Sequence, residues 1–228
     1  MLRPCAEKVS RTYGECDMIE INHWDLITAW VSPKKIDLAK FISSALQDQP
    51  SQLYFIDATN SFPIREFQRE TPVATNKDVY DNIRIITCLE LEELTILVNK
   101  IIQTIQLNKI ERQKKKSQNN SHHNDIQFFP DLKMRVIING LEIMFKNTQF
   151  KQDSETTHSI LRDILLRLRV IANESEGTQM QTLLLFPKDE FKISVPVGDT
   201  GRYKRMRSNH NGNSLGEYVC KFYADRVM

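Results

Sequence analysis

The residues whose types most clearly point to a function lie near the C-terminus, in a basic segment between Gly198 and Gly212. This segment contains the run Arg202-Tyr203-Lys204-Arg205-Met206-Arg207, and no acidic residue occurs from Arg202 through Leu215. Long cationic side chains on a glycine-containing loop can reach phosphates, and an aromatic ring offers a face on which a base can stack. The segment therefore predicts contact with DNA or RNA through Arg202, Tyr203, Lys204, Arg205 and Arg207. The alternatives are a nuclear-import signal and a solvated surface loop.

Two other segments bear on nucleotide chemistry through what they lack. The apolar run Met134–Asn139 ends in an uncharged amide, whereas the matching strand of a nucleotide-hydrolysing sheet should end in an acidic residue that holds the phosphate-bound metal. The turn Ser32–Asp37 follows the first expected strand but contains no glycine, so its backbone cannot wrap a phosphate in the usual way. Lys34 and Lys35 could touch an anion at the start of the helix, but we expect solvated surface lysines there.

Two further candidates for chemistry are better explained as structural residues. Asp57 ends an apolar strand and could be a catalytic carboxylate, but we expect it to be a turn former that caps Thr59-Asn60-Ser61. His122-His123 have no Cys or acidic partner at metal-ligand spacing, so a zinc site is not expected. The sequence therefore predicts no cofactor and no metal.

The elements that must position these residues alternate between strands and helices, which is typical of an α/β protein with a mostly parallel sheet. Met134–Asn139 is apolar on both faces, as a central strand covered by helices should be, although Asn139-Gly140 also fits a hairpin turn. Helices are expected after Ser32, after the capping box Thr87-x-x-Glu90, and after Asp153 or Ser154. The remaining expected strands are Asp25–Val31, Leu53–Ala58, Asn82–Thr87 and Leu183–Phe186, with an irregular connection at 62–79 and a last helix at Ser214–Tyr223 followed by a short strand.

The composition predicts one intracellular globular domain. The chain has 228 residues, 40% hydrophobic and 26% charged, with a net charge of +2, so attraction to nucleic acid must come from local patches. Its four cysteines show no CxxC pair, which indicates reduced thiols, and no apolar stretch approaches the roughly 18 residues of a membrane span. We expect residues 1–23 to be a flexible leader and 24–228 a single domain that carries the basic segment as a loop at about 197–213. A low-complexity insertion at 109–127 begins with basic residues that could touch phosphates, but a disordered surface loop is favoured there.

Several segments resemble known proteins. The tail Gly212-Asn213-Ser214-Leu215 … Lys221-Phe222-Tyr223-Ala224 is similar to the part of RecA-type recombinases that follows the second DNA-binding loop. A closer resemblance, from about Asp25 to the C-terminus, is to the recombinase-paralogue subunits of the yeast Shu complex. The segments that carry it are Phe55-Ile56-Asp57-Ala58-Thr59, Asn82-Ile83-Arg84, Leu89–Leu94, Ile138-Asn139-Gly140-Leu141-Glu142, Leu161-Arg162-Asp163 and Phe186-Pro187-Lys188.

This resemblance implies a RecA-like core with degenerate ATPase motifs and no bound nucleotide. It also implies a heterodimer with a second RecA-like subunit, assembly with two further Shu subunits, and action on a strand-exchange recombinase and its mediators in recombination and repair. In the family, consecutive basic residues of the second loop contact DNA. These positions fall on Lys204, Arg205 and Arg207, with Arg202 just before them, and Met206 stands where another basic residue is expected.

The sequence thus predicts a non-catalytic DNA-binding subunit that acts in the nucleus, and also in the cytoplasm, on forked or single-strand-tailed DNA. Two alternatives remain open. The chain could be an interaction scaffold whose partner makes the DNA contact, or it could be a RecA-type ATPase with degenerate motifs.

Overall fold

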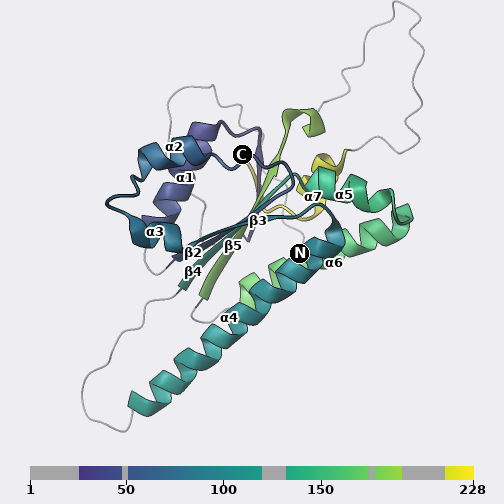
Figure 1. The fold of residues 1–228 in the computed structure, drawn as a ribbon. Coiled ribbons are helices and arrows are strands. Elements are labelled where there is room, and N and C mark those ends of the chain that lie inside the picture. Colours follow the sequence, from purple (N-terminus) through teal and green to yellow (C-terminus); the bar gives the residue numbers. More distant parts are fainter. Residues whose placement is uncertain (1–25, 48–50, 120–131, 175–177, 192–213) are drawn as a thin grey trace, which may run out of the picture.

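Six strands form a single sheet in which every paired neighbour is parallel (Figure 1). The computed structural model describes residues 26–47, 51–119, 132–174, 178–191 and 214–228. The order across the sheet is β3-β2-β4-β5-β1-β6. The strands are β1 (Ile27–Val31), β2 (Ser51–Asp57), β3 (Ile83–Thr87), β4 (Leu132–Asn139), β5 (Thr178–Phe186) and β6 (Arg226–Val227). The predicted parallel α/β architecture is confirmed.

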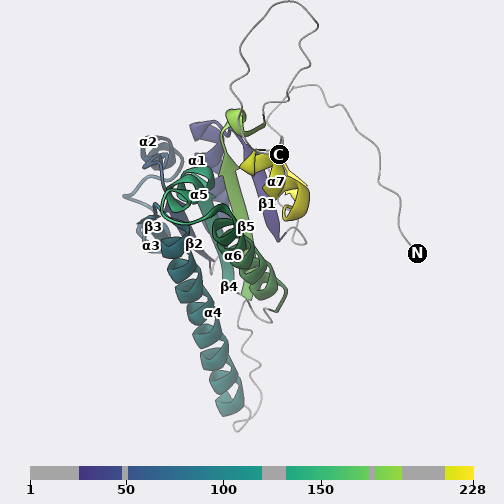
Figure 2. The ribbon, with the colours of Figure 1, turned by 90° about the vertical axis from the view of Figure 1, so that its right-hand side faces the viewer.

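Helices cover both faces of this sheet (Figures 1 and 2). One face packs against α1 (Lys35–Gln47), α2 (Ile64–Glu70) and α3 (Lys77–Asp81). The other packs against α4 (Leu91–Asn119), α5 (Leu141–Gln149), α6 (Ser154–Glu174) and α7 (Leu215–Phe222), and a short 3-10 helix, η1 (Lys188–Phe191), follows β5. Two apolar cores result, one on each side, because a parallel sheet with helical crossovers is buried on both faces.

The strand β4 lies between β2 and β5 and contributes to both cores. Met134, Val136 and Ile138 face the core under α4 and α6, while Ile137 faces the core under α1 and α2. The hairpin alternative is excluded, since β4 is parallel to both neighbours and Gly140 leads into α5 with φ of 82°. A Cβ on Gly140 would lie 2.9 Å from the Ala58 side chain, so this left-handed turn requires glycine.

Several expected boundaries shift. The connection at 62–79 contains α2 and the start of α3, where an irregular segment was expected. The expected insertion at 109–127 begins inside α4, whose last turns extend to Asn119, because its Lys, Arg, Gln and Glu residues are good helix formers. The start of α6 is capped by Asp153, whose Oδ1 accepts a 2.8 Å hydrogen bond from the Thr156 backbone N–H. The leader, residues 120–127 of the insertion and the basic segment lie outside the described residues.

The two cysteines of the described part agree with the expected reduced thiols. Cys88 and Cys220 are free thiols. Burial raises the pKa of Cys88 to about 12 and that of Cys220 to about 11, so both stay protonated and unreactive at neutral pH. Among the helices that the structure describes, none combines the length and the apolar character needed to cross a bilayer.

Candidate nucleic-acid interface

The predicted phosphate-binding residues Arg202, Tyr203, Lys204, Arg205 and Arg207 lie outside the described residues. The structure does describe both flanks of their segment. On the N-terminal side of the segment, η1 ends at Phe191. On the C-terminal side, the first described residue is Ser214, which caps α7. Both flanks lie where β5 ends, at the C-terminal edge of the parallel sheet (Figure 1).

Glu190 holds these two flanks together. The hydroxyl of Ser214 donates to the Glu190 backbone carbonyl, and the Gly216 N–H lies 3.2 Å from Glu190 Oε2. Ser214 also caps α7 in the ordinary way, since its Oγ accepts from the Glu217 N–H at 3.3 Å. The two described flanks of the basic segment are therefore joined at one point on the sheet edge.

The close packing of α7 on η1 depends on the absence of a side chain at position 216. A Cβ there would lie 2.9 Å from Glu190 Cβ and 3.1 Å from two ring carbons of Phe191. Such separations require one of the elements to move. Gly216 is therefore part of the clamp, although the basic run alone gave no reason to select it.

A buried carboxyl, Glu142, lies beside this clamp on α5. Its side chain is 7% exposed, its Oε2 has no hydrogen-bond partner among the described residues, and burial raises its pKa, with the nearby charge of Glu190 adding to the effect. Lys146 opposes this shift and pairs with Glu190 at 3.8 Å. Carboxylates as well as a cation thus lie beside the clamp. Any phosphate contact must therefore come from residues of the basic segment beyond it.

A second feature of the same sheet edge lies between β2 and β4. The chain leaves β2 toward α2 on one face and leaves β4 toward α5 on the other, so the two loops separate between these neighbouring strands. Ligands of open parallel sheets bind at such points, outside the C-terminal ends of the strands. This position is therefore where a nucleotide or metal site would be sought.

Four polar side chains occupy that position and bond to one another. The amide nitrogen of Asn139 lies 3.0 Å from Asp57 Oδ1, 2.7 Å from Thr59 Oγ1 and 2.8 Å from Ser61 Oγ. The Asp57 carboxylate also accepts from the backbone N–H groups of Thr59 at 2.8 Å and Ser61 at 2.6 Å. The prediction that Asp57 caps the 59–61 turn is confirmed.

This cluster is chemically complete without a ligand. Asp57 is 2% exposed and both of its oxygens are taken by donors of the chain itself. Asn139 supplies a neutral donor where a metal-holding strand would present a second carboxylate. Within the described ranges, no group of three or more His, Cys, Asp or Glu side chains is placed to hold a metal. The cluster fixes the β2 loop to the end of β4.

The turn after β1 is also unsuited to phosphate. Ser32 has φ of 50°, its N–H donates to the Phe186 carbonyl at 2.7 Å, and α1 begins only at Lys35. A phosphate loop needs several free backbone N–H groups that converge on one anion. Here the N–H of Ser32 is already bonded to β5. This agrees with the expectation that a turn without glycine does not wrap a phosphate.

Sequence reasoning identified Asp57 and Asn139 separately but missed that they form one cluster with Thr59 and Ser61. The available signal was the common position of the two residues at the ends of neighbouring parallel strands. It also missed Glu190, for which the sequence carries no signal, because its contacts to Ser214 and Gly216 join residues 24 and 26 positions apart.

A six-stranded parallel sheet in the order β3-β2-β4-β5-β1-β6, covered by helices on both faces, makes this chain an α/β protein whose architecture is consistent with a RecA-like core. The chain belongs to the family described as Shu complex component Csm2, DNA-binding, whose model matches residues 27–224.

Individual relatives match the sequence of this chain over most of their own length. The chain is 41% identical to chromosome segregation in meiosis protein 2 of Saccharomyces cerevisiae, over 92% of this chain and 100% of that protein. It is 34% identical to the protein of the same name from Candida glabrata, over 89% of this chain and 94% of the relative. For the Eremothecium gossypii protein of that name the identity is 32%, over 76% and 84% respectively.

Proposed function

We propose that this chain is a non-catalytic subunit of a Shu-type complex that binds DNA through the basic run at 202–207. The observation that carries the proposal is the clamp of Glu190 on Ser214 and Gly216, which anchors both ends of the basic segment at one point of the sheet edge. Membership in a family of DNA-binding Shu components supports it. Arg202, Lys204, Arg205 and Arg207 bind phosphates, and Tyr203 stacks on a base.

The DNA contact is expected to be independent of sequence, since Arg and Lys side chains on such a segment meet mainly the backbone. The DNA is forked or single-strand-tailed, and the chain works as a heterodimer with a second RecA-like subunit, together with two further Shu subunits. The assembly promotes loading of a strand-exchange recombinase during recombination and repair. It acts in the nucleus and is also present in the cytoplasm. These roles follow from the family resemblance and from the absence of catalytic groups in the cluster around Asn139.

The test is DNA affinity across a salt series, measured on the chain co-expressed with its RecA-like partner. If four phosphates are neutralised, the log–log slope is about −3.6 and affinity falls about a hundredfold between about 50 and 200 mM salt. The triple variant Lys204→Ala, Arg205→Ala, Arg207→Ala should bind more weakly and flatten the slope by about 2.7.

A matched control removes three cations from the opposite end of the molecule through Lys109→Ala, Arg112→Ala and Lys114→Ala. It changes the net charge equally and should leave the slope unchanged. If both triple variants bind DNA like the wild type, the chain is a scaffold and its partner makes the contact. Equal losses of DNA affinity in both triple variants would show that binding depends on the overall charge of the protein and not on the basic run.

A RecA-type ATPase is the second candidate function, because the fold is shared with such enzymes. It requires a phosphate loop and a metal-holding acid at the β1 turn and at position 139. Thermal stabilisation by ATP with Mg²⁺, together with hydrolysis above background, would favour it over the proposed role. We expect neither.

A further inference from the structure

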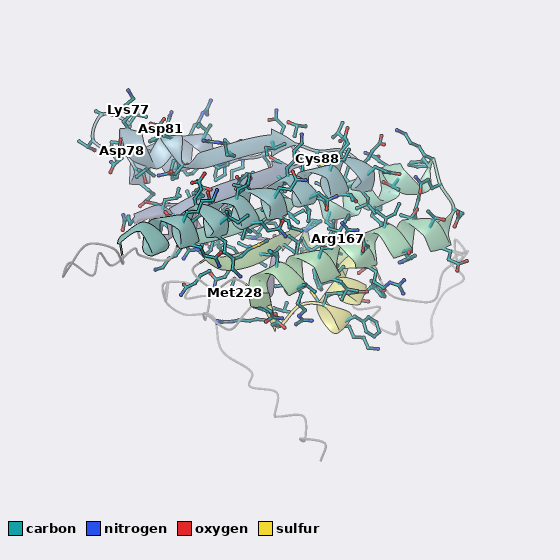
Figure 3. All side chains as sticks on the ribbon, turned by 90° about the horizontal axis from the view of Figure 1, so that it is seen from below. Lys77, Asp78, Asp81, Cys88, Arg167 and Met228 are labelled. Atoms are coloured by element: carbon teal, nitrogen blue, oxygen red, sulfur yellow. The ribbon has the colours of Figure 1, made fainter. Side chains whose placement is uncertain are left out.

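The outer side of the α4–α6 layer carries large apolar residues that face solvent. On α4 these are Ile96, Leu107 and Ile110, with exposures of 56%, 60% and 46%, and on α6 they are Leu166 and Val170, with exposures of 46% and 50%. The two helices pack side by side, and Arg167 lies on α6 (Figure 3). Its Nη1 is 2.9 Å from Asn99 Oδ1 of α4. The exposed residues therefore belong to one surface, which we call the outer helical face.

The spacing on α4 places its exposed apolar residues opposite those it buries. Leu94, Val98, Ile101 and Ile105 form the stripe that packs on the sheet. At 3.6 residues per turn, Ile96, Leu107 and Ile110 fall within about 40° of one line on the other side of the helix. A helix that is apolar on two opposite sides is normally covered on both.

The last turns of α4 extend past the sheet (Figure 2). A helix of 29 residues is about 43 Å long, whereas the eight residues of β4 span about 26 Å. Up to residue 114, Ile105 is the last buried residue of α4, and none of residues 106–114 is buried. Leu107 and Ile110 thus follow this buried residue and are exposed, so a partner could contact them without displacing another element.

The charge of this projecting end indicates the chemistry of its partner. Residues 109–114 contain the cations Lys109, Arg112 and Lys114 and the single carboxylate Glu111. Lys100 and Lys114, both exposed, lie on the same line as the three apolar residues. A surface that combines an apolar stripe with cations is complementary to an amphipathic helix that has acidic residues along its apolar stripe.

Other classes of partner fit less well. Nucleic acid would use the cations but would leave Leu107 and Ile110 without apolar contacts, since phosphates dominate such interfaces. A membrane-surface helix inserts a broad apolar face with aromatic anchors, whereas this stripe has no aromatic residue and is interrupted by Lys100 and Gln103.

We propose that the outer helical face, centred on Leu107 and Ile110, is a docking site for an acidic amphipathic helix of a partner protein. The site lies away from the sheet edge that bears the basic segment, because α4 begins at that edge and ends beyond the opposite one (Figure 1). It therefore goes beyond the proposed DNA contact and does not depend on it.

The test uses a labelled synthetic helix with leucine at the apolar heptad positions and glutamate beside them, titrated with the full chain and followed by fluorescence anisotropy. A second peptide has lysine in place of every glutamate. The acidic peptide should bind saturably and the basic peptide at least about tenfold more weakly. The double variant Leu107→Ser, Ile110→Ser should weaken binding of the acidic peptide by at least about tenfold, because two apolar side chains leave the interface.

The control variant is Ile64→Ser, which removes an apolar side chain of similar exposure, 47%, from α2 on the other side of the sheet. It should bind the acidic peptide like the wild type. All variants should unfold at wild-type temperatures, because the substituted side chains are exposed.

Four results would overturn the proposal. They are equal binding of the two peptides, unchanged binding by the Leu107 and Ile110 variant, loss of DNA affinity in that variant, and a self-association seen by sedimentation that the variant abolishes. The remaining case is a wild-type chain that binds neither peptide. If a truncation that removes residues 120–131 then binds the acidic peptide, the chain covers this face itself.

Discussion

Replacing Asn139 by aspartate tests the polar cluster at the C-terminal edge of the sheet. The substitution keeps the shape of the side chain but exchanges its donor nitrogen for an acceptor oxygen. That nitrogen lies 3.0 Å from Asp57 Oδ1 and within 2.8 Å of the hydroxyl oxygens of Thr59 and Ser61. Because Asp57 is buried, the introduced carboxylate would face a second negative charge that water screens poorly.

The size of the effect follows from that separation. Two unit charges about 3 Å apart at an effective dielectric constant of about 20 repel by about 5 kcal/mol. The introduced carboxyl can avoid this by staying protonated, and holding a group of ordinary pKa of about 3.9 neutral at pH 7 costs about 4 kcal/mol. The smaller figure sets the outcome, so Asn139→Asp should lower the free energy of unfolding by about 4 kcal/mol at pH 7.

The pH dependence identifies the cause of this loss. The pKa of the introduced carboxyl is raised in the folded state, so its penalty is absent below its unfolded pKa and grows as the pH rises toward the folded value. The deficit relative to wild type should therefore shrink by about 1.4 kcal/mol for each pH unit from about pH 7 down to about pH 5. Urea denaturation at several pH values measures it.

The control variant Asn139→Ala removes the same hydrogen bonds without adding a charge. It should cost about 1–3 kcal/mol, the usual penalty for leaving buried polar groups without partners, with no dependence on pH over this range. If Asn139→Asp is as stable as wild type at pH 7, or if its deficit does not change with pH, the cluster does not exist as described.

Three further predictions concern the helix starts and the clamp. Gly216→Ala should destabilise the chain by about 1–3 kcal/mol, since the added methyl group overpacks α7 against Glu190, and thermal unfolding measures the loss. Asp153→Ala should cost about 1 kcal/mol by removing the cap of α6, and a circular dichroism melt that matches wild type would refute this. In wild type, the raised pKa of Glu142 means that its stabilising effect is complete below its unfolded pKa and is lost as the pH rises through the folded one. Glu142→Gln should therefore gain stability relative to wild type as the pH rises, and urea midpoints across pH test the sign.

The sequence was sufficient to predict the buried strand and the helices that cover it, because the signals for them are local. Met134–Asn139 is apolar on both faces, and the helices around it have strong caps and stripes. The hairpin alternative at Asn139-Gly140 was also a valid local interpretation. Only the pairing of β4 with β2 and β5 decides between them, and that pairing is set by contacts between residues 82 and 46 positions apart.

The parts that could not be predicted depend on long-range geometry. Asp57 and Asn139 were each noticed, but their contact requires the register in which they face each other at the ends of β2 and β4. The helical extension of α4 was hidden by composition, since lysine, glutamine and serine suit a solvated loop and an exposed helix alike. There the apolar residues Leu107 and Ile110 were the more informative signal, because a solvated loop has no need of them.

The two proposed surfaces can be used at the same time because of how α4 runs. It begins beside the C-terminal edge of the sheet, where the flanks of the basic segment are clamped, and its last turns extend past the opposite edge. Leu107 and Ile110 follow the buried residue Ile105 on that half of the helix. A duplex held at the clamped edge would leave the outer helical face uncovered. Substitutions at 204–207 should therefore alter DNA affinity and its salt dependence alone, and substitutions at 107 and 110 should alter protein docking alone. Coupling between the two sets would require the sheet, which has a packed core on each face, to transmit strain from one edge to the other.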